Sequence, residues 1–563
     1  MADSAPAGKH DASDVGSVKC EVVSGVAKWG NPLEALLATL GPFGLYQRFV
    51  VVLLLIPNLL APMYTFNYVF VADRVPFRCI VPECEWGQPQ FSNSTVEQLL
   101  PPDECVRYAP LEPDVSSCDA QDFHQNNTVP CEGFVYENHD TVYAEFGLAC
   151  REWRRTLVGT VRNAALPLAL VLTGYISDRW GRRTAFCIFA AFAGALGVAK
   201  SFANTYNIYI TLEFFEAALG YGFNSAAYVM MIELARPSLR AAFACATGVA
   251  YGMGGVLFAV VARYLPHWRD LLRAIHTPAL LLPMYWLILD ESVRWLHATQ
   301  QTDKAKTVIN KAARWNKVTL DETSVRNALD SNTAQDEGPK ENAWLSLLKS
   351  RVLMVRFMAC CFCWIAAAFV YYGLTINSVA LSGDKYTNFA LNMVMDIVAS
   401  LLIMMALERI GRRISICVAF VLCGISSMIP MFTSNTATHQ SVYFMGKLSI
   451  TFAFNSLYVF TAELFPTSVR SSALAATSLV GRLGSILAPQ TPLLNPTIQT
   501  LLYTGCSLLA AAAVVLVPET RRAPLPQHVR QAERLRKLAT PRASTTHPPP
   551  PPVPSFTRIS QSS

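Results

Sequence analysis

The chain has 563 residues, of which 52% are hydrophobic and 15% are charged, and its formal net charge is +6. Soluble domains usually carry about 25% charged residues, so this composition argues against a soluble globular protein. The net charge is too small to indicate a nucleic-acid partner. The sequence also lacks zinc-ligand spacing and a phosphate-binding glycine loop, so we expect no metal and no cofactor.

The first long apolar block runs from Gly44 to Val71 and contains one charged residue, Arg48, near its start. A helix of about 20 residues crosses the roughly 30 Å hydrocarbon core of a bilayer, so this block is long enough to span it. The polar composition before the block, and the length of the block itself, do not fit a cleavable signal peptide. We therefore expect an uncleaved first membrane span.

Eleven further apolar blocks follow along the chain. They lie at residues 156–176, 184–203, 206–232, 241–262, 271–289, 352–379, 386–407, 414–432, 442–464, 471–493 and 498–517. The pattern predicts an all-α membrane protein with twelve transmembrane helices in two halves of six. The expected organisation is an N-terminal segment (1–43), a first bundle (44–289) that includes an outer loop (72–155), a central loop (290–351), a second bundle (352–517) and a disordered tail (518–563).

The positions of Lys and Arg in the short loops predict the orientation, because such residues concentrate on the cytoplasmic side. Two arginine clusters, at residues 179–183 and 409–413, fall on the same side of the membrane as the basic central loop and the tail. We therefore expect both termini in the cytoplasm and the 72–155 loop outside the cell.

The composition of the 72–155 loop supports this orientation. It contains six cysteines, Cys79, Cys84, Cys105, Cys118, Cys131 and Cys150. Oxidising conditions outside the cell permit three disulfides, and a short loop domain with little apolar content needs them. Glycosylation sequons at Asn93 and Asn126 favour the same side.

The tail after about Arg521 has no apolar periodicity and contains the run Pro548–Pro552. This composition predicts a disordered cytoplasmic extension. The run is interpreted as a plain spacer, with a polyproline-binding partner as the alternative.

Two motifs recur at an offset of 230 residues. Gly174–Arg183 is echoed by Glu408–Arg413, and Glu233–Arg240 is echoed by Glu463–Arg470. A third pair, at residues 290–292 and 518–520, is offset by 228. Parallel repeats of six helices are a transporter architecture in which the substrate site lies between the repeats at the middle of the membrane.

The repeated loops are predicted to act as latches. An acid followed by Arg-x-Gly-Arg-Arg can pair with nearby acids and helix ends, with glycine allowing the turn and arginine supplying bidentate contacts. Such contacts hold the cytoplasmic side shut, whereas on the alternative interpretation the basic residues only fix the topology. The gating candidates are Gly174, Asp178, Arg179, Gly181, Arg182, Arg183, Glu233, Arg240, Glu408, Arg409, Gly411, Arg412, Arg413, Glu463 and Arg470.

The Gly174–Arg183 segment resembles the cytoplasmic motif of the major facilitator superfamily. Together with the cysteine-rich loop, the segments Leu265–Arg269, Glu291–Leu296 and Ala462–Arg470 resemble the organic cation, carnitine and organic anion transporters of solute carrier family 22. The resemblance is closest to the carnitine-type subgroup. It implies the major facilitator fold and facilitated or ion-coupled transport by alternating access.

Two charged residues stand out inside predicted spans, Asp396 in the eighth and Arg482 in the eleventh. Ionisable residues in a membrane are costly and are functional candidates by default. By the resemblance, Asp396 matches an acidic family position, and Arg482 matches a position that is arginine in anion and carnitine carriers. We expect a substrate ammonium near Asp396 and a carboxylate at Arg482. The alternative is that the two residues pair with each other and hold the bundle together.

Aromatic and polar residues complete the predicted substrate site. Trp364 and Tyr371 are seven residues apart, two helical turns on one face, and match family cavity positions. Their rings suit an ammonium group through cation–π contact of roughly 0.5–2 kcal/mol, although ordinary packing is an equal alternative. Asn455 and Tyr228 match further cavity positions by the resemblance.

The sequence therefore predicts a plasma-membrane carrier, not an enzyme, for small zwitterionic or cationic amines of carnitine, carcinine or β-amino acid type. An organic anion carrier is the first alternative, favoured by Arg482 and opposed by Asp396. A non-transporting receptor or scaffold is the alternative from another class. A coupling ion, Na⁺ or H⁺, is possible, but the sequence contains no motif that distinguishes Na⁺ coupling from H⁺ coupling.

Overall fold

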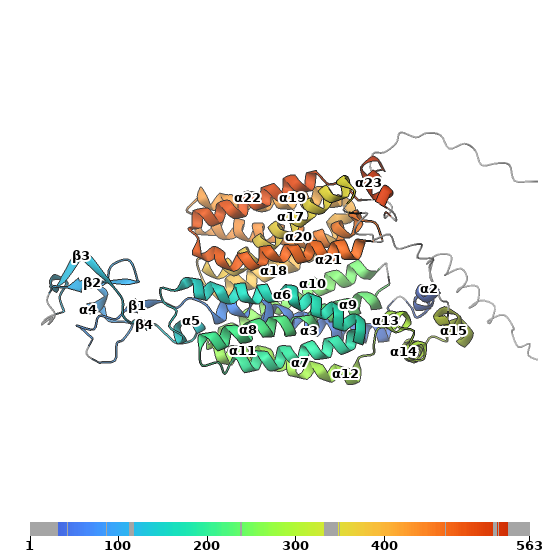
Figure 1. Cartoon of the computed structure of the whole chain (residues 1–563), viewed down its shortest axis with the longest axis horizontal. Coiled ribbons are helices and arrows are strands. Elements are labelled where there is room, and N and C mark those ends of the chain that lie inside the picture. Colours follow the sequence, from blue (N-terminus) through green and yellow to red (C-terminus); the bar gives the residue numbers. More distant parts are fainter. Residues whose placement is uncertain are drawn as a thin grey trace, which may run out of the picture.

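The computed structural model describes residues 32–41, 43–85, 87–111, 118–236, 239–330, 347, 349–467, 469–521, 526 and 529–538. Two sets of long helices lie side by side, with a small strand-containing domain at one end and short helices at the other (Figure 1). We call these sets the N half and the C half.

The N half begins with α3 (Leu45–Val71), which contains Pro57 and Pro62. A membrane helix tolerates proline where neighbouring helices satisfy the freed backbone groups. The remaining helices are α6 (Glu152–Trp180), α7 (Arg182–Lys200), α8 (Tyr206–Gly220), α9 (Gly222–Leu234), α10 (Arg240–Tyr264), α11 (Trp268–His276), η3 (Thr277–Met284) and α12 (Tyr285–Ile288).

The C half has the same order of long helices. They are α17 (Arg351–Asn377), η4 (Ser378–Ala380), α18 (Lys385–Arg409), α19 (Arg412–Met428), η5 (Ile429–Met431), α20 (Thr436–Leu464), α21 (Arg470–Leu487), η6 (Ala488–Leu493) and α22 (Pro496–Val515).

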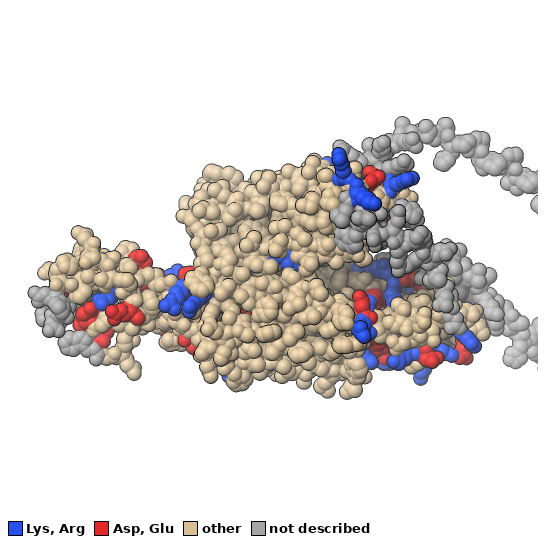
Figure 2. Space-filling view, viewed as in Figure 1, with Lys and Arg blue, Asp and Glu red and all other residues tan. Residues whose placement is uncertain are grey.

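Ten spans among the described residues are long and apolar enough to cross a membrane. The other two predicted blocks are the pair α8–α9, which breaks at Tyr221, and α20, which carries Lys447 and Asn455 among its apolar residues. In the view of Figure 2, Lys, Arg, Asp and Glu gather at the two ends of the molecule and leave the middle of the bundle largely free of charge. The predicted all-α membrane fold of twelve helices is confirmed.

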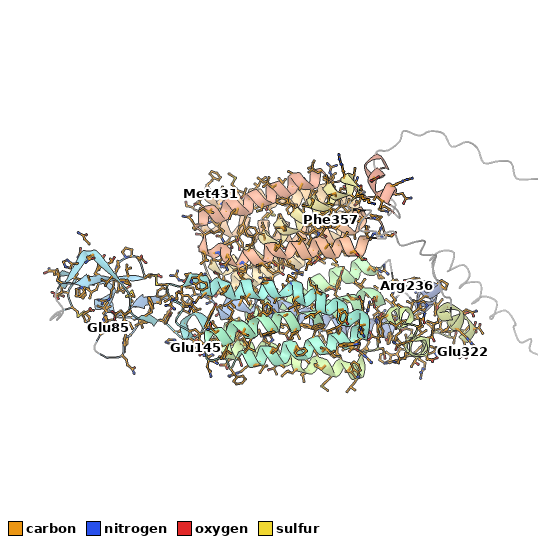
Figure 3. The ribbon with its side chains drawn as sticks, in the orientation of Figure 1. Glu85, Glu145, Arg236, Glu322, Phe357 and Met431 are labelled. Atoms are coloured by element: carbon orange, nitrogen blue, oxygen red, sulfur yellow. A yellow bond between two sulfur atoms is a disulfide. The ribbon has the colours of Figure 1, made fainter. Side chains whose placement is uncertain are left out.

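The small domain defines what we call the disulfide end, where Glu85 and Glu145 are labelled in Figure 3. Two antiparallel pairs form it, β1 (Phe77–Cys79) with β4 (Phe134–Tyr136) and β2 (Val106–Pro110) with β3 (Phe123–Pro130). The short elements α4 (Ser94–Glu97), η1 (Ala120–Asp122) and α5 (Val142–Glu145) complete it.

Three disulfides hold this domain together, as predicted from the six cysteines. They join Cys79 to Cys131, Cys84 to Cys118 and Cys105 to Cys150. The apolar core beside them is small among the residues of this domain that the structure describes, with Val81, Val96, Leu99 and Phe123 buried in it. Cross-links compensate for such a small core, because they limit the freedom of the unfolded chain.

The opposite end, which we call the linker end, carries short helices of the central loop; Arg236 and Glu322 mark it in Figure 3. The helices are α13 (Val293–Ala298), α14 (Thr302–Asn316) and α15 (Glu322–Asp330), and α2 (Pro32–Thr39) packs against them. Arg294 joins α13 to α2 through a 2.6 Å ion pair with Glu34.

One part of the predicted disordered tail is a helix, α23 (Val529–Leu538). Arg356 of α17 donates a 2.6 Å hydrogen bond to the Ala532 carbonyl oxygen, and Ser350 donates a 2.6 Å bond to the Glu533 carboxylate. The prediction of disorder was wrong here, because these contacts with α17 stabilise a segment whose composition alone is polar. The run Pro548–Pro552 lies outside the described residues.

Candidate functional site

The candidate substrate site lies where the two halves face each other. The halves contact along α10 with α18 and along α6 with α21 and η6. Figure 2 shows the surface hollowed between the halves at the linker end, with basic side chains inside the hollow. A site between the repeats near the middle of the spans is the arrangement expected of a carrier with parallel repeats.

Arg482 of α21 lies in this interface and is partly buried. Its Nη1 is 3.4 Å from the hydroxyl oxygen of Tyr372 on α17, and its guanidinium carbon is 5.9 Å from the ring centre of Tyr221 in the N half. Tyr458 also lies within electrostatic range of Arg482. Throughout the described chain no ion pair with an acid involves Arg482, so its positive charge stands without a neutralising carboxylate.

Four tyrosines form an aromatic cluster here: Tyr221, Tyr372 and Tyr458 lie around this guanidinium, and Tyr228 lies near Tyr458. Tyr228 and Tyr458 are exposed, and they come from α9 and α20 respectively, on opposite halves. A cation beside phenol rings and hydroxyls offers a substrate both charge pairing and ring contact. Two predicted site residues, Tyr228 and Arg482, thus share Tyr458 as a neighbour.

Asp396 of α18 has a different environment, 4% exposed. Its carboxylate accepts hydrogen bonds from Tyr371 at 2.9 Å and from Thr451 at 2.6 Å, and Lys447 of α20 lies 3.2 Å away. The alternative in which Asp396 pairs with Arg482 is therefore wrong. Lys447 takes the place of that partner, because α18 and α20 pack together inside the C half.

The Lys447 ammonium is fully buried and makes several contacts besides the ion pair. It donates a 2.7 Å hydrogen bond to Thr375 and lies 3.5 Å from the ring centre of Tyr371. Asp396 and Tyr371 therefore already surround an ammonium group, which belongs to the protein itself.

Trp364 and Tyr371 share a neighbour, as their helical spacing predicts. Both rings pack on Phe454, at 5.6 Å and 5.3 Å between centroids. The Trp364 indole N–H donates a 3.1 Å hydrogen bond to Thr461, and its ring meets Tyr458 edge-on at 4.5 Å. Trp364 is fully buried, so it supports the tyrosine cluster from behind.

Asn455 lies on α20, three residues before Tyr458, and is partly buried. It therefore lies near the tyrosine cluster along the helix, and its role in substrate binding stays a prediction.

The N half contains a buried charge cluster that sequence reasoning missed. It consists of Arg162, Lys200, Glu213 and Glu216, none more than 2% exposed. Arg162 pairs with Glu213 at 2.8 Å and with Glu216, while Lys200 pairs with the same two acids at 2.5 Å and 3.3 Å. Two bases and two acids make the cluster neutral. The signal was visible, since all four charges lie inside predicted apolar blocks.

The repeated loop motifs occupy equivalent places in the two halves. Gly181 and Gly411, between α6 and α7 and between α18 and α19, have φ of +100° and +120°, a conformation that favours glycine. A Cβ at either position would meet a carboxylate, Glu291 or Glu519 respectively. Only glycine therefore fits both the turn and its neighbour.

These two carboxylates come from the third repeated pair of the sequence. Glu291 accepts hydrogen bonds from the backbone N–H groups of Arg182 and Arg183, and Glu519 does the same for Arg412 and Arg413. Each acid caps the positive end of a helix, α7 or α19. Burial raises the pKa of the Glu291 carboxyl, although these backbone donors favour its charged form.

The arginine side chains of the motifs also pair within their own halves. Arg182 contacts Asp178 at 3.0 Å and Glu233 at 3.1 Å, and Arg412 contacts Glu463 at 3.3 Å. Glu408 makes no ion pair within the described residues. In this conformation the predicted latches join helices inside each half, and none of the described ion pairs of Arg182 or Arg412 joins one half to the other.

We expect Glu291→Gln and Glu519→Gln each to lower transport turnover several-fold at normal surface expression. Glutamine keeps one acceptor but presents an NH₂ to backbone donors, and an unsatisfied buried group costs about 1–3 kcal/mol. Initial uptake rates normalised to surface protein measure the effect. Glu322→Gln is the matched control, because the Glu322 side chain is 76% exposed and pairs with Lys306, outside the repeated motifs. A larger loss in that control than in Glu291→Gln contradicts the capping role.

Comparison with known proteins agrees with this architecture. The family model described as "Sugar (and other) transporter" matches residues 125–529. An organic cation transporter protein of Drosophila melanogaster is 29% identical over 89% of this chain and 94% of its own. The organic cation/carnitine transporter 2 of Rattus norvegicus is 27% identical over 89% of this chain and 94% of its own.

Solved structures share the fold at low sequence identity. The inward open conformation of the xylose transporter XylE from E. coli aligns with a TM-score of 0.55 and 15% identity, covering 84% of this chain and 98% of that one. A further structure of this transporter, a major facilitator superfamily proton:xylose symporter, aligns with a TM-score of 0.53 and 17% identity over 88% of this chain and 99% of that one. The chain therefore belongs to the sugar (and other) transporter family, and it shares the fold of a major facilitator superfamily symporter.

Proposed function

We propose that this transporter carries small zwitterionic or cationic amines, and that it prefers carboxylate-bearing zwitterions of carnitine or β-amino acid type to carcinine-type amines, which have no carboxylate. The observation that carries the proposal is Arg482, a guanidinium between the halves with no described acid partner. A planar guanidinium binds a carboxylate through two parallel hydrogen bonds.

The tyrosine cluster supports the zwitterionic class. A substrate whose carboxylate meets Arg482 places its ammonium a few ångströms away, among the rings of Tyr221, Tyr228, Tyr372 and Tyr458. Phenol faces attract such a cation. Direct pairing of the substrate ammonium with Asp396 requires Lys447 to move away, since the two residues are 3.2 Å apart.

An organic anion carrier is the second candidate. Lys447 neutralises Asp396, so the nearby charges sum to one positive charge, that of Arg482. A purely anionic substrate needs no ammonium site and fits this balance. The two candidates differ in whether the tyrosine rings contribute to affinity.

Uptake of three matched compounds distinguishes these candidates: an amino carboxylate with a quaternary ammonium, its uncharged-head carboxylate analogue, and its ammonium analogue without the carboxylate. We expect the zwitterion to be taken up best and the ammonium analogue least. Preference for the simple carboxylate favours the anion carrier, and preference for the ammonium analogue contradicts carboxylate recognition. Repeating the uptake with and without Na⁺, and across a pH gradient, identifies a coupling ion.

The disulfide domain and the basic linker end support an orientation in the plasma membrane. Disulfides persist outside the cell and arginine-rich loops stay inside, so we propose that the disulfide end is extracellular and both termini are cytoplasmic. Asn126 is exposed on β3 and Asn93 is partly exposed, so both are accessible to glycosylation.

Enzymatic deglycosylation is expected to increase the gel mobility of the wild-type chain. The Asn93→Gln, Asn126→Gln double variant should migrate like deglycosylated wild type, and its mobility should not change on treatment. Gel electrophoresis of protein from the cell surface measures both. An unchanged wild type means that the disulfide end does not face the glycosylating compartment.

A further inference from the structure

The two halves are joined at the disulfide end by two ion pairs of opposite polarity. Lys385, the first residue of α18, lies 2.6 Å from Asp73 after α3, and the preceding Asp384 lies 2.9 Å from Arg263 at the end of α10. Neighbouring residues of the C half thus carry opposite charges and meet opposite charges of the N half. The pairing holds only when these helix ends are in register.

An aromatic layer lies directly beneath these ion pairs. Phe70 of α3 stacks on Tyr386 of α18 at 5.2 Å between centroids and meets Phe389 edge-on at 5.1 Å. Phe258 of α10 packs on both Phe70 and Phe389, at 5.3 Å and 5.8 Å. Phe70, Phe258 and Phe389 are buried, so this layer separates the substrate site from the disulfide end.

A second polar contact joins the halves where α6 meets η6. The amide of Gln490 accepts a 3.0 Å hydrogen bond from Thr156 and donates a 2.7 Å bond to Thr160. The disulfide end is therefore closed on both sides of the bundle. The linker end is hollowed between the halves in Figure 2.

We propose that Asp73, Arg263, Asp384 and Lys385 form the gate at the disulfide end, whose two ion pairs must separate before the halves can open there. Alternating access requires such a separation, because the same helix ends meet in this conformation and must part in the opposite one. The charges also select the register in which the halves close again. The four residues therefore control the transport cycle without touching the substrate.

The ion pairs of the gate are weak enough to separate during transport. Its side chains are partly exposed, from 16% for Asp73 to 59% for Arg263. Exposed ion pairs are weak, and water replaces their contacts readily. A reversed charge turns this weak attraction into repulsion, and we expect about a tenfold shift in the open-to-closed ratio, which corresponds to about 1.4 kcal/mol.

Thiol accessibility tests the gate without any substrate. Ala259 of α10 is 2% exposed and lies one helical turn below Arg263 on the same face. An Ala259→Cys reporter in the full-length chain is labelled with a membrane-impermeant, negatively charged methanethiosulfonate in sealed vesicles, with the reagent on one face at a time. Labelling of the parent chain, which keeps its free cysteines, is subtracted.

We expect Lys385→Asp in the reporter chain to raise labelling from the disulfide face about tenfold, and Asp73→Lys to do the same. The swapped chain, Asp73→Lys with Lys385→Asp, is expected to return to the reporter's rate, because the ion pair is restored with reversed polarity. Lys306→Asp is the matched control, since Lys306 pairs with Glu322 at the linker end, away from the gate.

Two results overturn the proposal: unchanged labelling in both single variants, or a swapped chain that stays as reactive as the singles. Surface expression is measured beside labelling, and the swapped chain shows whether a poorly expressed single variant is a folding defect or an opened gate. These results are independent of the carboxylate proposal, because that proposal is tested by substrate preference in uptake and makes no prediction for the labelling rate of Ala259→Cys.

Discussion

Replacing Arg482 by alanine is expected to weaken recognition of a carboxylate substrate by roughly one to two orders of magnitude. A charge-assisted hydrogen bond contributes about 1.5–3 kcal/mol, which converts to that range of affinity. An analogue without the carboxylate should lose much less. Competition by each compound for uptake, in wild type and Arg482→Ala, measures the two losses.

Folding should withstand this substitution. Arg482 is partly exposed, and its described polar contacts are hydrogen bonds to the neutral hydroxyls of Tyr372 and Tyr221. Its removal therefore leaves no buried acid unpaired. Arg482→Lys is the matched control, since it keeps the charge but loses the planar fork. Equal loss of both compounds in a well-expressed Arg482→Ala variant means that the arginine supports the structure instead of binding a carboxylate.

Much of the fold follows from local properties of the sequence. Every predicted apolar block corresponds to a helix or to successive helices, because span length is set by the bilayer and each block carries its own signal. The break of one predicted block into α8 and α9 at Tyr221 was not predicted, since hydropathy does not report a local change of backbone direction.

Contacts between helices were harder to predict than the helices themselves. The sequence identified Asp396 and Arg482 as unusual charges, but their partners depend on which helices pack together and at what depth. Lys447 lies in a predicted span as well, and pairing Asp396 with it needed knowledge that α18 lies against α20. The neutral cluster of Arg162, Lys200, Glu213 and Glu216 was missed for the same reason.

The repeated motifs illustrate the same limit of prediction from sequence. The pair at residues 290–292 and 518–520 was found from the sequence, but its role was not. Only the structure shows Glu291 and Glu519 capping α7 and α19 beside two glycines of positive φ. Repetition in the sequence indicates that a residue has the same role in both halves, but the role itself depends on contacts that only the three-dimensional structure shows.

Lys447→Ala is expected to have the largest effect on stability. The substitution leaves Asp396 charged, 4% exposed and without its ion-pair partner, and breaking a buried pair in this way costs about 3–5 kcal/mol. We expect a marked loss of surface protein and a lower thermal unfolding midpoint in detergent. Lys306→Ala, which breaks an exposed pair with Glu322, should leave surface protein and the unfolding midpoint nearly unchanged, because water screens exposed ion pairs.

Removing both charges separates the structural role of this pair from a role in transport. In the Asp396→Asn, Lys447→Gln double variant no unpaired charge stays buried, so most of the lost stability should return. A double variant as unstable as Lys447→Ala contradicts the ion pair as the cause. If the double variant is stable, its uptake of different substrates shows whether the pair also takes part in transport. Uptake that matches wild type means that the pair is a purely structural contact of α18 with α20. A loss of uptake confined to ammonium-bearing substrates means that Asp396 breaks its ion pair with Lys447 and binds the substrate ammonium instead.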